Sequence, residues 1–352
     1  MSLSRFSGKE IEDFCSFLSR EYGLSFPPAR YSFVENRIEP LMADFSCRTL
    51  SDIILRARRD LKLRMDLLNN LTTNETWFFR HPEHFTILRR NVLPELLARK
   101  KKTGDNRISI WSAGCSVGAE LFSILFTLLD VLPDSEKFNL QLVGSDISSE
   151  IIKSARQCAF NSHQMRLIDP RTMTRFFQVT GHERWCVKPE YTKMVEFEVL
   201  NLLNSWPART YDIIFCRNTM IYFDSDNKQR LTERFFDTLN ADGYFFTSAN
   251  ETIHVEDLAG IRKVFLENEI IYQKSGGRRE YCIFRFVTPA DLLRALNILK
   301  NNGFDYQLEK IQSENQLEPT RSICVNRSDM NNIEELFNLS SIKISNIETL
   351  SR

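Results

Sequence analysis

Small residues at one strand-to-helix turn and an acidic residue after the next strand give the first indication of a ligand site. The strand-like segment Ile108–Ser112 runs into Ala113-Gly114-Cys115-Ser116-Val117-Gly118, and a helical pattern follows. Glycine at such a turn lets the backbone approach a ligand and leaves the helix N-terminus open toward it. About thirty residues later Asp146 ends the next strand, where nucleotide-binding sheets place a carboxylate for ribose hydroxyls. Asp146 could instead cap the following helix, in competition with Ser148 and Ser149.

Two further segments combine polar and aromatic residues more densely than a turn requires. CRNTMIYFD at 216–224 follows a strand directly, and LTTNETWFFR at 71–80 lies in a helical region. Open α/β sheets bind ligands at the carboxyl ends of their strands. Helix caps from Asp224 and Thr72 account for part of each segment. The side chains that these caps leave unexplained are those of Asn74, Thr76, Arg80, Arg217 and Asn218.

The glycine pattern favours a ligand without phosphate groups. The G-x-G-x-x-G pattern of dinucleotide sites is absent, so no third glycine is available for a pyrophosphate. S-adenosylmethionine keeps the adenosine and carries a zwitterionic methionine in place of the phosphates. The motifs therefore predict a methyltransferase that uses S-adenosylmethionine.

Composition excludes several other classes of protein. The 46 Lys and Arg residues balance 46 Asp and Glu residues, so the bulk charge does not indicate a nucleic-acid partner. The longest mainly apolar run, Leu121–Leu129, is about half of what a bilayer span needs. None of the eight cysteines pair as C-x-x-C, so we expect no metal site. We expect a cytoplasmic protein without direct membrane insertion.

Alternating strands and helices must position these residues. Residues 1 to about 104 show helical periodicity, and after them β-rich runs alternate with helical stretches, which predicts an α/β domain with a largely parallel sheet. The expected strands are Ile108–Ser112, Leu140–Gly144, Val195–Val199, Tyr211–Phe215, Tyr244–Ser248, Ile270–Gln273 and Tyr281–Val287. Phe176–Val187 predicts a small antiparallel insertion, and Ala290–Asn301 a helix. From about Gln312 the chain is polar and without pattern.

Five blocks of this sequence resemble those of the chemotaxis receptor methyltransferases, the CheR-type protein-glutamate O-methyltransferases. The blocks are TTNETWFFR at 72–80, WSAGCSVGAE at 111–120, GSDIS at 144–148, VEFEVLNLL at 195–203 and IIFCRNTMIYFD at 213–224. They occur in the family's order and spacing, and the resemblance covers about residues 10–287.

The resemblance implies an all-α N-terminal domain and a Rossmann-like S-adenosylmethionine-dependent methyltransferase domain with a small antiparallel β-subdomain. We expect a helical domain at 1–85, a linker helix at 86–106, the methyltransferase domain at 107–287 with its β-subdomain at 176–195, and a C-terminal helix and polar tail at 288–352. The implied partners are the cytoplasmic methylation helices of chemoreceptors, and we expect a monomer.

The resemblance also implies site residues. With Gly114 of the glycine loop, the implied cofactor contacts are Asn74, Thr76, Arg80, Glu120, Asp146, Asn201, Leu202, Asn218 and Thr219. Asp146 would hold the ribose or adenosine region, Asn201 and Leu202 the adenine, and Asn218 and Thr219 the methionine. Arg80 and Tyr222 are candidates for steering the acceptor, and no catalytic acid or base is nominated, because a glutamate acceptor is already ionised at pH 7.

Two segments depart from the family pattern. Family members usually have G-E-E-P-Y-S where this chain has Gly118-Ala119-Glu120-Leu121-Phe122-Ser123, and S-E where it has Ala249-Asn250-Glu251. Two alternatives therefore stay open: a methyltransferase of this architecture with another acceptor, and a cofactor-binding adaptor that has lost turnover.

Overall fold

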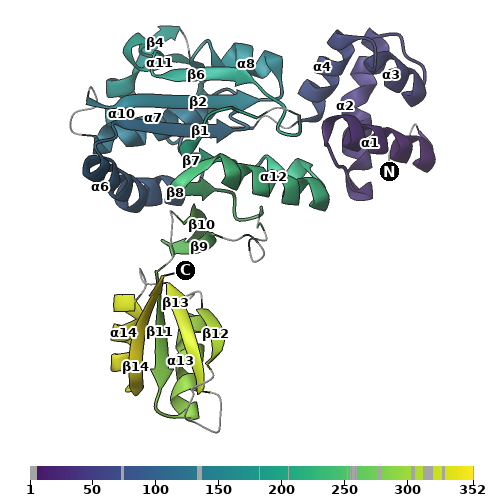
Figure 1. The fold of residues 1–352 in the computed structure, drawn as a ribbon. Helices are drawn as coiled ribbons and strands as arrows, with labels where there is room; N and C mark the ends of the chain where they lie inside the picture. Colours follow the sequence, from purple (N-terminus) through teal and green to yellow (C-terminus); the bar gives the residue numbers. More distant parts are fainter. Residues whose placement is uncertain are drawn as a thin grey trace. The chain divides into compact units, whose positions relative to one another are not determined.

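A computed structural model describes residues 6–72, 75–132, 137–181, 183–204, 206–251, 253, 255, 258, 260–275, 280–302, 306–311, 320–326 and 330–351. The chain divides into two compact units (Figure 1). The first comprises Met1–Leu258 and Leu266–Ile271, and the second comprises Ala259–Phe265 and Tyr272–Arg352.

The first unit begins with an all-helical domain. Its elements are α1 (Gly8–Tyr22), η1 (Pro28–Arg30), α2 (Tyr31–Asp44), α3 (Leu50–Ala57) and α4 (Leu61–Leu71). Capping boxes start α1 and α3, because Ser7 with Glu10 and Thr49 with Asp52 exchange side-chain and backbone hydrogen bonds. The apolar faces of the four α-helices form one hydrophobic cluster.

A seven-stranded sheet forms the centre of the methyltransferase domain, in the order β6-β2-β1-β7-β8-β10-β9. Its strands are β1 (Arg107–Ala113), β2 (Asn139–Asp146), β6 (Val195–Val199), β7 (Tyr211–Phe215), β8 (Leu239–Phe246), β9 (Ile261–Leu266) and β10 (Glu269–Lys274). The five strands from β6 to β8 run parallel to their neighbours. The strand order reverses between β1 and β7, and ligands bind such sheets at the carboxyl ends beside that reversal.

Helices connect these strands, and a three-stranded subdomain with the order β3-β5-β4 interrupts them. The helices are α5 (Pro82–Ile87), the π-helical η2 (Leu88–Val92), α6 (Leu93–Thr103), α7 (Ala119–Val131), α8 (Ser149–Ala155), α9 (Ser162–Met165), α10 (Pro170–Phe176), α11 (Pro189–Thr192), η4 (Met220–Tyr222) and α12 (Ser225–Thr238). The subdomain strands are β3 (Ala159–Asn161), β4 (Phe177–Gly181) and β5 (Arg184–Val187). Every residue of α7 from Ala119 to Leu129 is buried, which makes this helix the core of the domain.

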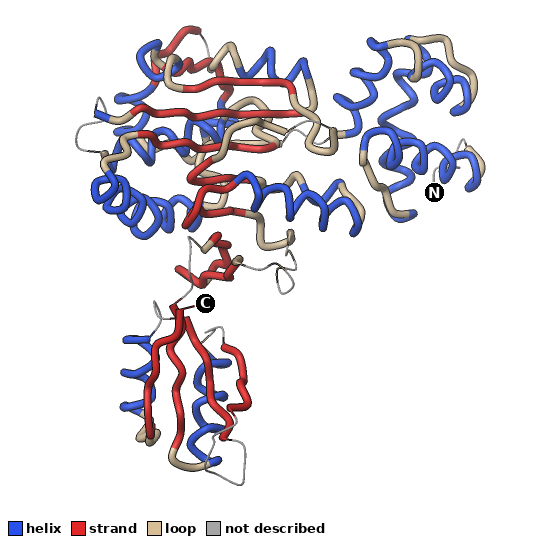
Figure 2. The backbone as a smooth tube through the Cα atoms, in the orientation of Figure 1, coloured by secondary structure: helices blue, strands red, loops and turns tan. Residues whose placement is uncertain are grey.

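From Glu280 to Ser351 the second unit forms a β-α-β-β-α-β arrangement (Figure 2). Its elements are β11 (Glu280–Phe286), α13 (Pro289–Asn301), β12 (Tyr306–Ile311), β13 (Thr320–Asn326), α14 (Met330–Leu339) and β14 (Ile344–Ser351). The strands form an antiparallel sheet in the order β12-β13-β11-β14. Side chains of α13 and α14 share a hydrophobic cluster with β11 and β13.

The structure differs from the expected organisation at three places. Residues 280–286 form a strand, as expected, but in the sheet of the second unit, and the stretch expected to be a patternless tail contains β13, α14 and β14. The inserted subdomain includes Ala159–Asn161, well before residue 176, because β5 pairs with β3 as well as with β4. The expected linker helix starts at Pro82, and residues of α5, η2 and α6 contact α7 of the methyltransferase domain.

Candidate functional site: a cavity at the carboxyl edge of the sheet

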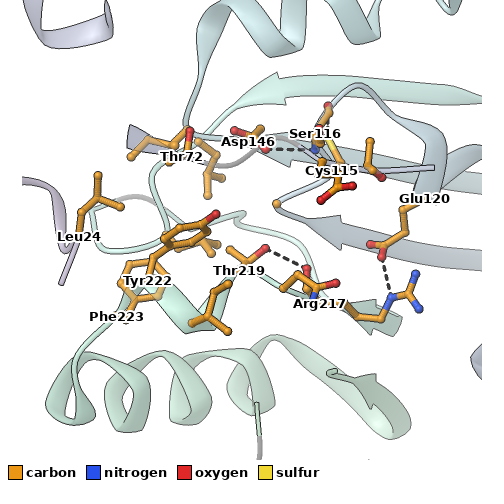
Figure 3. A pocket seen from close by; sticks show the side chains of 18 of the residues that line it. Leu24, Thr72, Cys115, Ser116, Glu120, Asp146, Arg217, Thr219, Tyr222 and Phe223 are labelled. Carbon is orange, nitrogen blue, oxygen red and sulfur yellow. Dashed lines mark hydrogen bonds and ion pairs between the residues drawn. The ribbon is translucent and has the colours of Figure 1, made fainter. Parts of the chain in front are cut away.

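A cavity lies where β1, β2, β6 and β7 end, beside the reversal of strand order (Figure 3). Its empty volume is about 1100 Å³, including its open mouth, which is enough for a ligand of nucleoside size. The residues named from the sequence that line it are Thr76, Arg80, Gly114, Glu120, Asp146, Asn201, Leu202, Asn218, Thr219 and Tyr222. Asn74 lies outside the described residues. The structure therefore brings side chains from four strand ends and from the 75–80 segment to one place.

The turn after β1 depends on two glycines in the left-handed region. Gly114 has φ +83°, and a Cβ atom there would overlap the Thr219 side chain. Gly118 has φ +92°, and a Cβ atom there would lie 2.7 Å from the Phe197 ring. Both positions require glycine for conformation and for space, so the turn stays open toward the cavity.

Asp146 is held at the end of β2 by backbone groups. Its Oδ2 accepts a hydrogen bond from the Ser116 N–H at 3.1 Å, and its Oδ1 accepts one from the Ser148 N–H at 3.0 Å. Burial raises the pKa of Asp146, and these backbone donors oppose that rise. Each carboxylate oxygen can accept more than one hydrogen bond, so Asp146 keeps acceptor capacity for a ligand hydroxyl. Ser148, not Asp146, caps α8.

A buried ion pair forms the wall opposite Asp146. Arg217 Nε donates to Glu120 Oε2 at 2.7 Å (Figure 3). Glu120 Oε1 also accepts from Ser112 Oγ at 2.8 Å. The Arg217 side chain is 2% exposed and that of Glu120 11%. Arg217 Nη1 also donates to the Arg80 carbonyl at 2.7 Å. Arg217 was noted in the sequence for its position, but its pairing with Glu120 was not anticipated.

Glu251 fixes the loop after β7, a role that no sequence motif indicates. Its carboxylate accepts backbone N–H groups of Asn218 at 2.6 Å, Ser248 at 3.2 Å and Ile221 at 3.2 Å. Asn218 has φ +58°, a left-handed conformation that is uncommon for a residue with a side chain. Burial raises the pKa of Glu251, and the backbone donors oppose that rise. Glu251 thus helps to hold Asn218, a residue of the cavity wall, in its left-handed conformation.

The helical domain supplies part of the cavity wall. Tyr22, Leu24 and Thr72 line the cavity, and none of them was selected from the sequence as a site residue. The Ser25 N–H donates to the Tyr222 carbonyl at 2.6 Å, and the Tyr222 side chain belongs to the hydrophobic cluster of the helical domain. Tyr222 is therefore positioned from both domains of the first unit.

Arg80 lies at the cavity wall with its charge close to an aromatic ring. Its Nη1 donates to the Glu75 carbonyl at 2.7 Å, and its guanidinium lies 4.5 Å from the centre of the Trp77 ring. Burial and the neighbouring Arg217 lower the pKa of Arg80.

The residues that depart from the family pattern after Gly118 lie in the core. Ala119, Leu121 and Phe122 are fully buried in α7 and do not line the cavity, whereas Glu120 does. The substitutions in this segment therefore change helix packing and leave the cavity wall intact.

His84, which contacts Arg217, is expected to make the free energy of unfolding depend on pH on the acid side. Burial lowers its pKa to about 3, so between pH 6.5 and 3 the unfolded chain binds a proton that the folded chain does not. We expect this proton to reduce the free energy of unfolding by up to about 1.4 kcal/mol per pH unit as pH falls through that window. Urea unfolding at several pH values should show a shallower acid-side loss for His84→Asn. An unchanged slope in that variant would contradict the expectation.

Neither a membrane-spanning helix nor a metal-binding cluster occurs in the described part of the chain. No helix there combines the length and the apolar character needed to cross a bilayer. No group of three or more His, Cys, Asp or Glu side chains there is placed to hold a metal ion.

Comparisons with known proteins agree with this geometry. Residues 74–267 match the family described as "CheR methyltransferase, SAM binding domain", and residues 9–72 match "CheR methyltransferase, all-alpha domain". The chain is 33% identical over 255 residues to chemotaxis protein methyltransferase 1 of Pseudomonas aeruginosa, covering 70% of this chain and 90% of that protein. It is 32% identical over 259 residues to chemotaxis protein methyltransferase 1 of Vibrio cholerae, covering 72% and 92%. Residues beyond 267 lie outside both family matches. The fold, the cavity and these matches show that the chain belongs to the CheR family of S-adenosylmethionine-dependent methyltransferases.

Proposed function

We propose that this protein transfers the methyl group of S-adenosylmethionine to glutamate side chains on the cytoplasmic helices of chemoreceptors. The observation that carries the proposal is the single cavity that collects Asp146, Glu120, Asn201, Asn218 and Thr219 at the carboxyl edge of the sheet. The relatives are chemotaxis protein methyltransferases, which supports chemotaxis as the setting. We further propose a cytoplasmic, monomeric enzyme.

The chemistry of the cavity wall fits this cofactor. The cofactor combines ribose hydroxyls, an adenine ring, an ammonium group and a carboxylate. All five residues line the cavity: Asp146 would accept from the hydroxyls, Asn201 and Leu202 would border the adenine, and Asn218 and Thr219 would border the methionine side. When bound, the cofactor supplies an electrophilic methyl group on a sulfonium.

The protein's own contribution to methyl transfer is alignment and exclusion of water. A glutamate carboxylate needs no general base at pH 7, so the reaction requires the acceptor oxygen to be held in line with the methyl group at about 3–3.5 Å. Arg80 and Tyr222 are our candidates for holding the acceptor, since one brings a positive charge and the other a hydroxyl to the cavity.

Tyr222→Phe is expected to lower kcat by about tenfold or more while leaving affinity for S-adenosylhomocysteine within about twofold. The backbone of Tyr222 stays held by Ser25, so the variant removes only the hydroxyl. Steady-state kinetics and calorimetry on the same preparation separate the two quantities. An unchanged kcat would leave Tyr222 with a packing role.

Asp146→Ala is expected to weaken cofactor binding by about 1–3 kcal/mol, because ribose hydroxyls lose a charged acceptor. Asp169→Ala is a matched control: Asp169 also accepts two backbone N–H groups, at the start of α10, but does not line the cavity. Calorimetry with S-adenosylhomocysteine should show weaker binding for Asp146→Ala alone. Equal affinities in the two variants would remove Asp146 from the cofactor site.

One incubation distinguishes the proposed function from its two alternatives. The full chain is mixed with methyl-labelled S-adenosylmethionine and either chemoreceptor cytoplasmic fragments or whole lysate. Base-labile label on receptor glutamates supports the proposal, because carboxyl methyl esters release methanol in base. Label that appears only on other acceptors, or cofactor binding without transfer to any acceptor, would overturn it.

A further inference from the structure

A buried row of polar side chains leads away from the cavity behind Arg217. The Arg217 Nη1 that bonds to the Arg80 carbonyl also lies 3.2 Å from His84 Nδ1. On the other side of the ring, His84 Nε2 lies 3.6 Å from Glu269 Oε2 on β10. The His84 side chain is 2% exposed and does not line the cavity.

The contacts of His84 define which nitrogen carries its hydrogen. A guanidinium can only donate, so Nδ1 must accept from Arg217. The single hydrogen of a neutral ring then lies on Nε2, facing the Glu269 carboxylate. The depressed pKa of His84 agrees with a neutral ring.

The remaining surroundings of Arg217 cannot set its orientation alone. Its guanidinium lies 5.2 Å from the centre of the Phe85 ring and 5.6 Å from that of Phe215, and such contacts stabilise a cation without fixing its rotation. Hydrogen bonds fix the plane of the guanidinium, and Arg217 donates them to Glu120, to the Arg80 carbonyl and to His84. His84 is the ring acceptor among these three.

We propose that His84 is a positioning residue for cofactor binding: its Nδ1 orients Arg217, and thereby Glu120, at the cavity wall, while Glu269 holds the ring in the required orientation. The inference rests on the proposed placement of S-adenosylmethionine in this cavity. His84 would then influence cofactor binding although it does not line the cavity.

Three variants of the full chain test the proposal. In His84→Asn, an oxygen occupies the position of Nδ1 and can accept from Arg217. In His84→Gln, the amide reaches toward Glu269 and leaves the Nδ1 position without an acceptor. In His84→Leu, the side chain has the shape of asparagine but no polar atoms. We expect His84→Leu and His84→Gln to weaken S-adenosylhomocysteine binding about tenfold, since a hydrogen bond to a charged group contributes about 1.5 kcal/mol. His84→Asn should stay within about threefold of the unchanged protein.

The readouts are calorimetric Kd values, the KM for S-adenosylmethionine, the KM for receptor fragments, and Tm. In His84→Leu and His84→Gln, the proposal requires the KM for S-adenosylmethionine to rise with the Kd for S-adenosylhomocysteine, while the KM for receptor fragments stays constant. Equal affinity in all variants would overturn it, and so would an equal loss in all three, because asparagine then fails to rescue and the role is packing. If the unchanged protein does not bind S-adenosylhomocysteine, the proposed function fails instead.

Discussion

Glu120→Leu is expected to lower the free energy of unfolding by about 3–5 kcal/mol, because it leaves the buried guanidinium of Arg217 without a counter-charge. It also leaves the Ser112 hydroxyl without its acceptor. We expect cofactor binding to fall below detection by calorimetry. Urea unfolding provides the stability measurement.

A double variant separates the cost of the unpaired charge from the loss of the site. Glu120→Leu combined with Arg217→Met removes both charges, and replacing both partners of a buried pair by apolar groups is often close to neutral. We therefore expect most of the stability to return while cofactor binding does not. Arg90→Met is the control: its exposed pair with Glu267 should contribute at most about 1 kcal/mol. A double variant as unstable as the single one would contradict the account.

Glu251→Ala is expected to reduce stability by about 2–4 kcal/mol and affinity for S-adenosylhomocysteine at least tenfold. Three backbone N–H groups lose their common acceptor, and the left-handed Asn218 keeps only the Ser248 hydroxyl as acceptor for its N–H. Asn250→Ala, at the exposed neighbouring position, is the control and should change neither quantity. Calorimetry and chemical unfolding of both variants give the measurement, and a Glu251→Ala protein with normal affinity would show that the loop keeps its shape unaided.

The central strands and the residues at their ends could be predicted from the sequence because their signals are local. β1, β2, β6 and β7 all include the expected segments, and polar residues directly after them line the cavity. β9 was not anticipated, because Ile261–Leu266 has two adjacent charged residues followed by three apolar ones and so lacks the alternation typical of a half-buried strand. β11 was expected as a strand but in the wrong sheet, since partners such as β13 and β14, which determine the sheet, lie far along the chain.

Site residues that depend on tertiary contacts could not be read from the chain. Glu251 looks like any acid after a strand, and its role appears only when three amides of two loops converge on it. Tyr22 and Leu24 lie about two hundred residues before Tyr222 and belong to no motif. His84 lies four residues after Arg80, but its hydrogen-bond donor is Arg217, which follows β7 and lies more than a hundred residues further along the chain.

The contribution of α1 and its C-terminal turn to the cavity wall links the lifetime of a bound ligand to the integrity of the helical domain. Tyr222 packs in the hydrophobic cluster of that domain, so partial unfolding of the N-terminal helices would remove one wall of the cavity and release the hold on the Tyr222 backbone. A ligand in the cavity favours the closed state and must oppose such opening by mass action. Residues of the helical cluster that no ligand touches therefore contribute to ligand affinity, through the stability of one wall of the cavity.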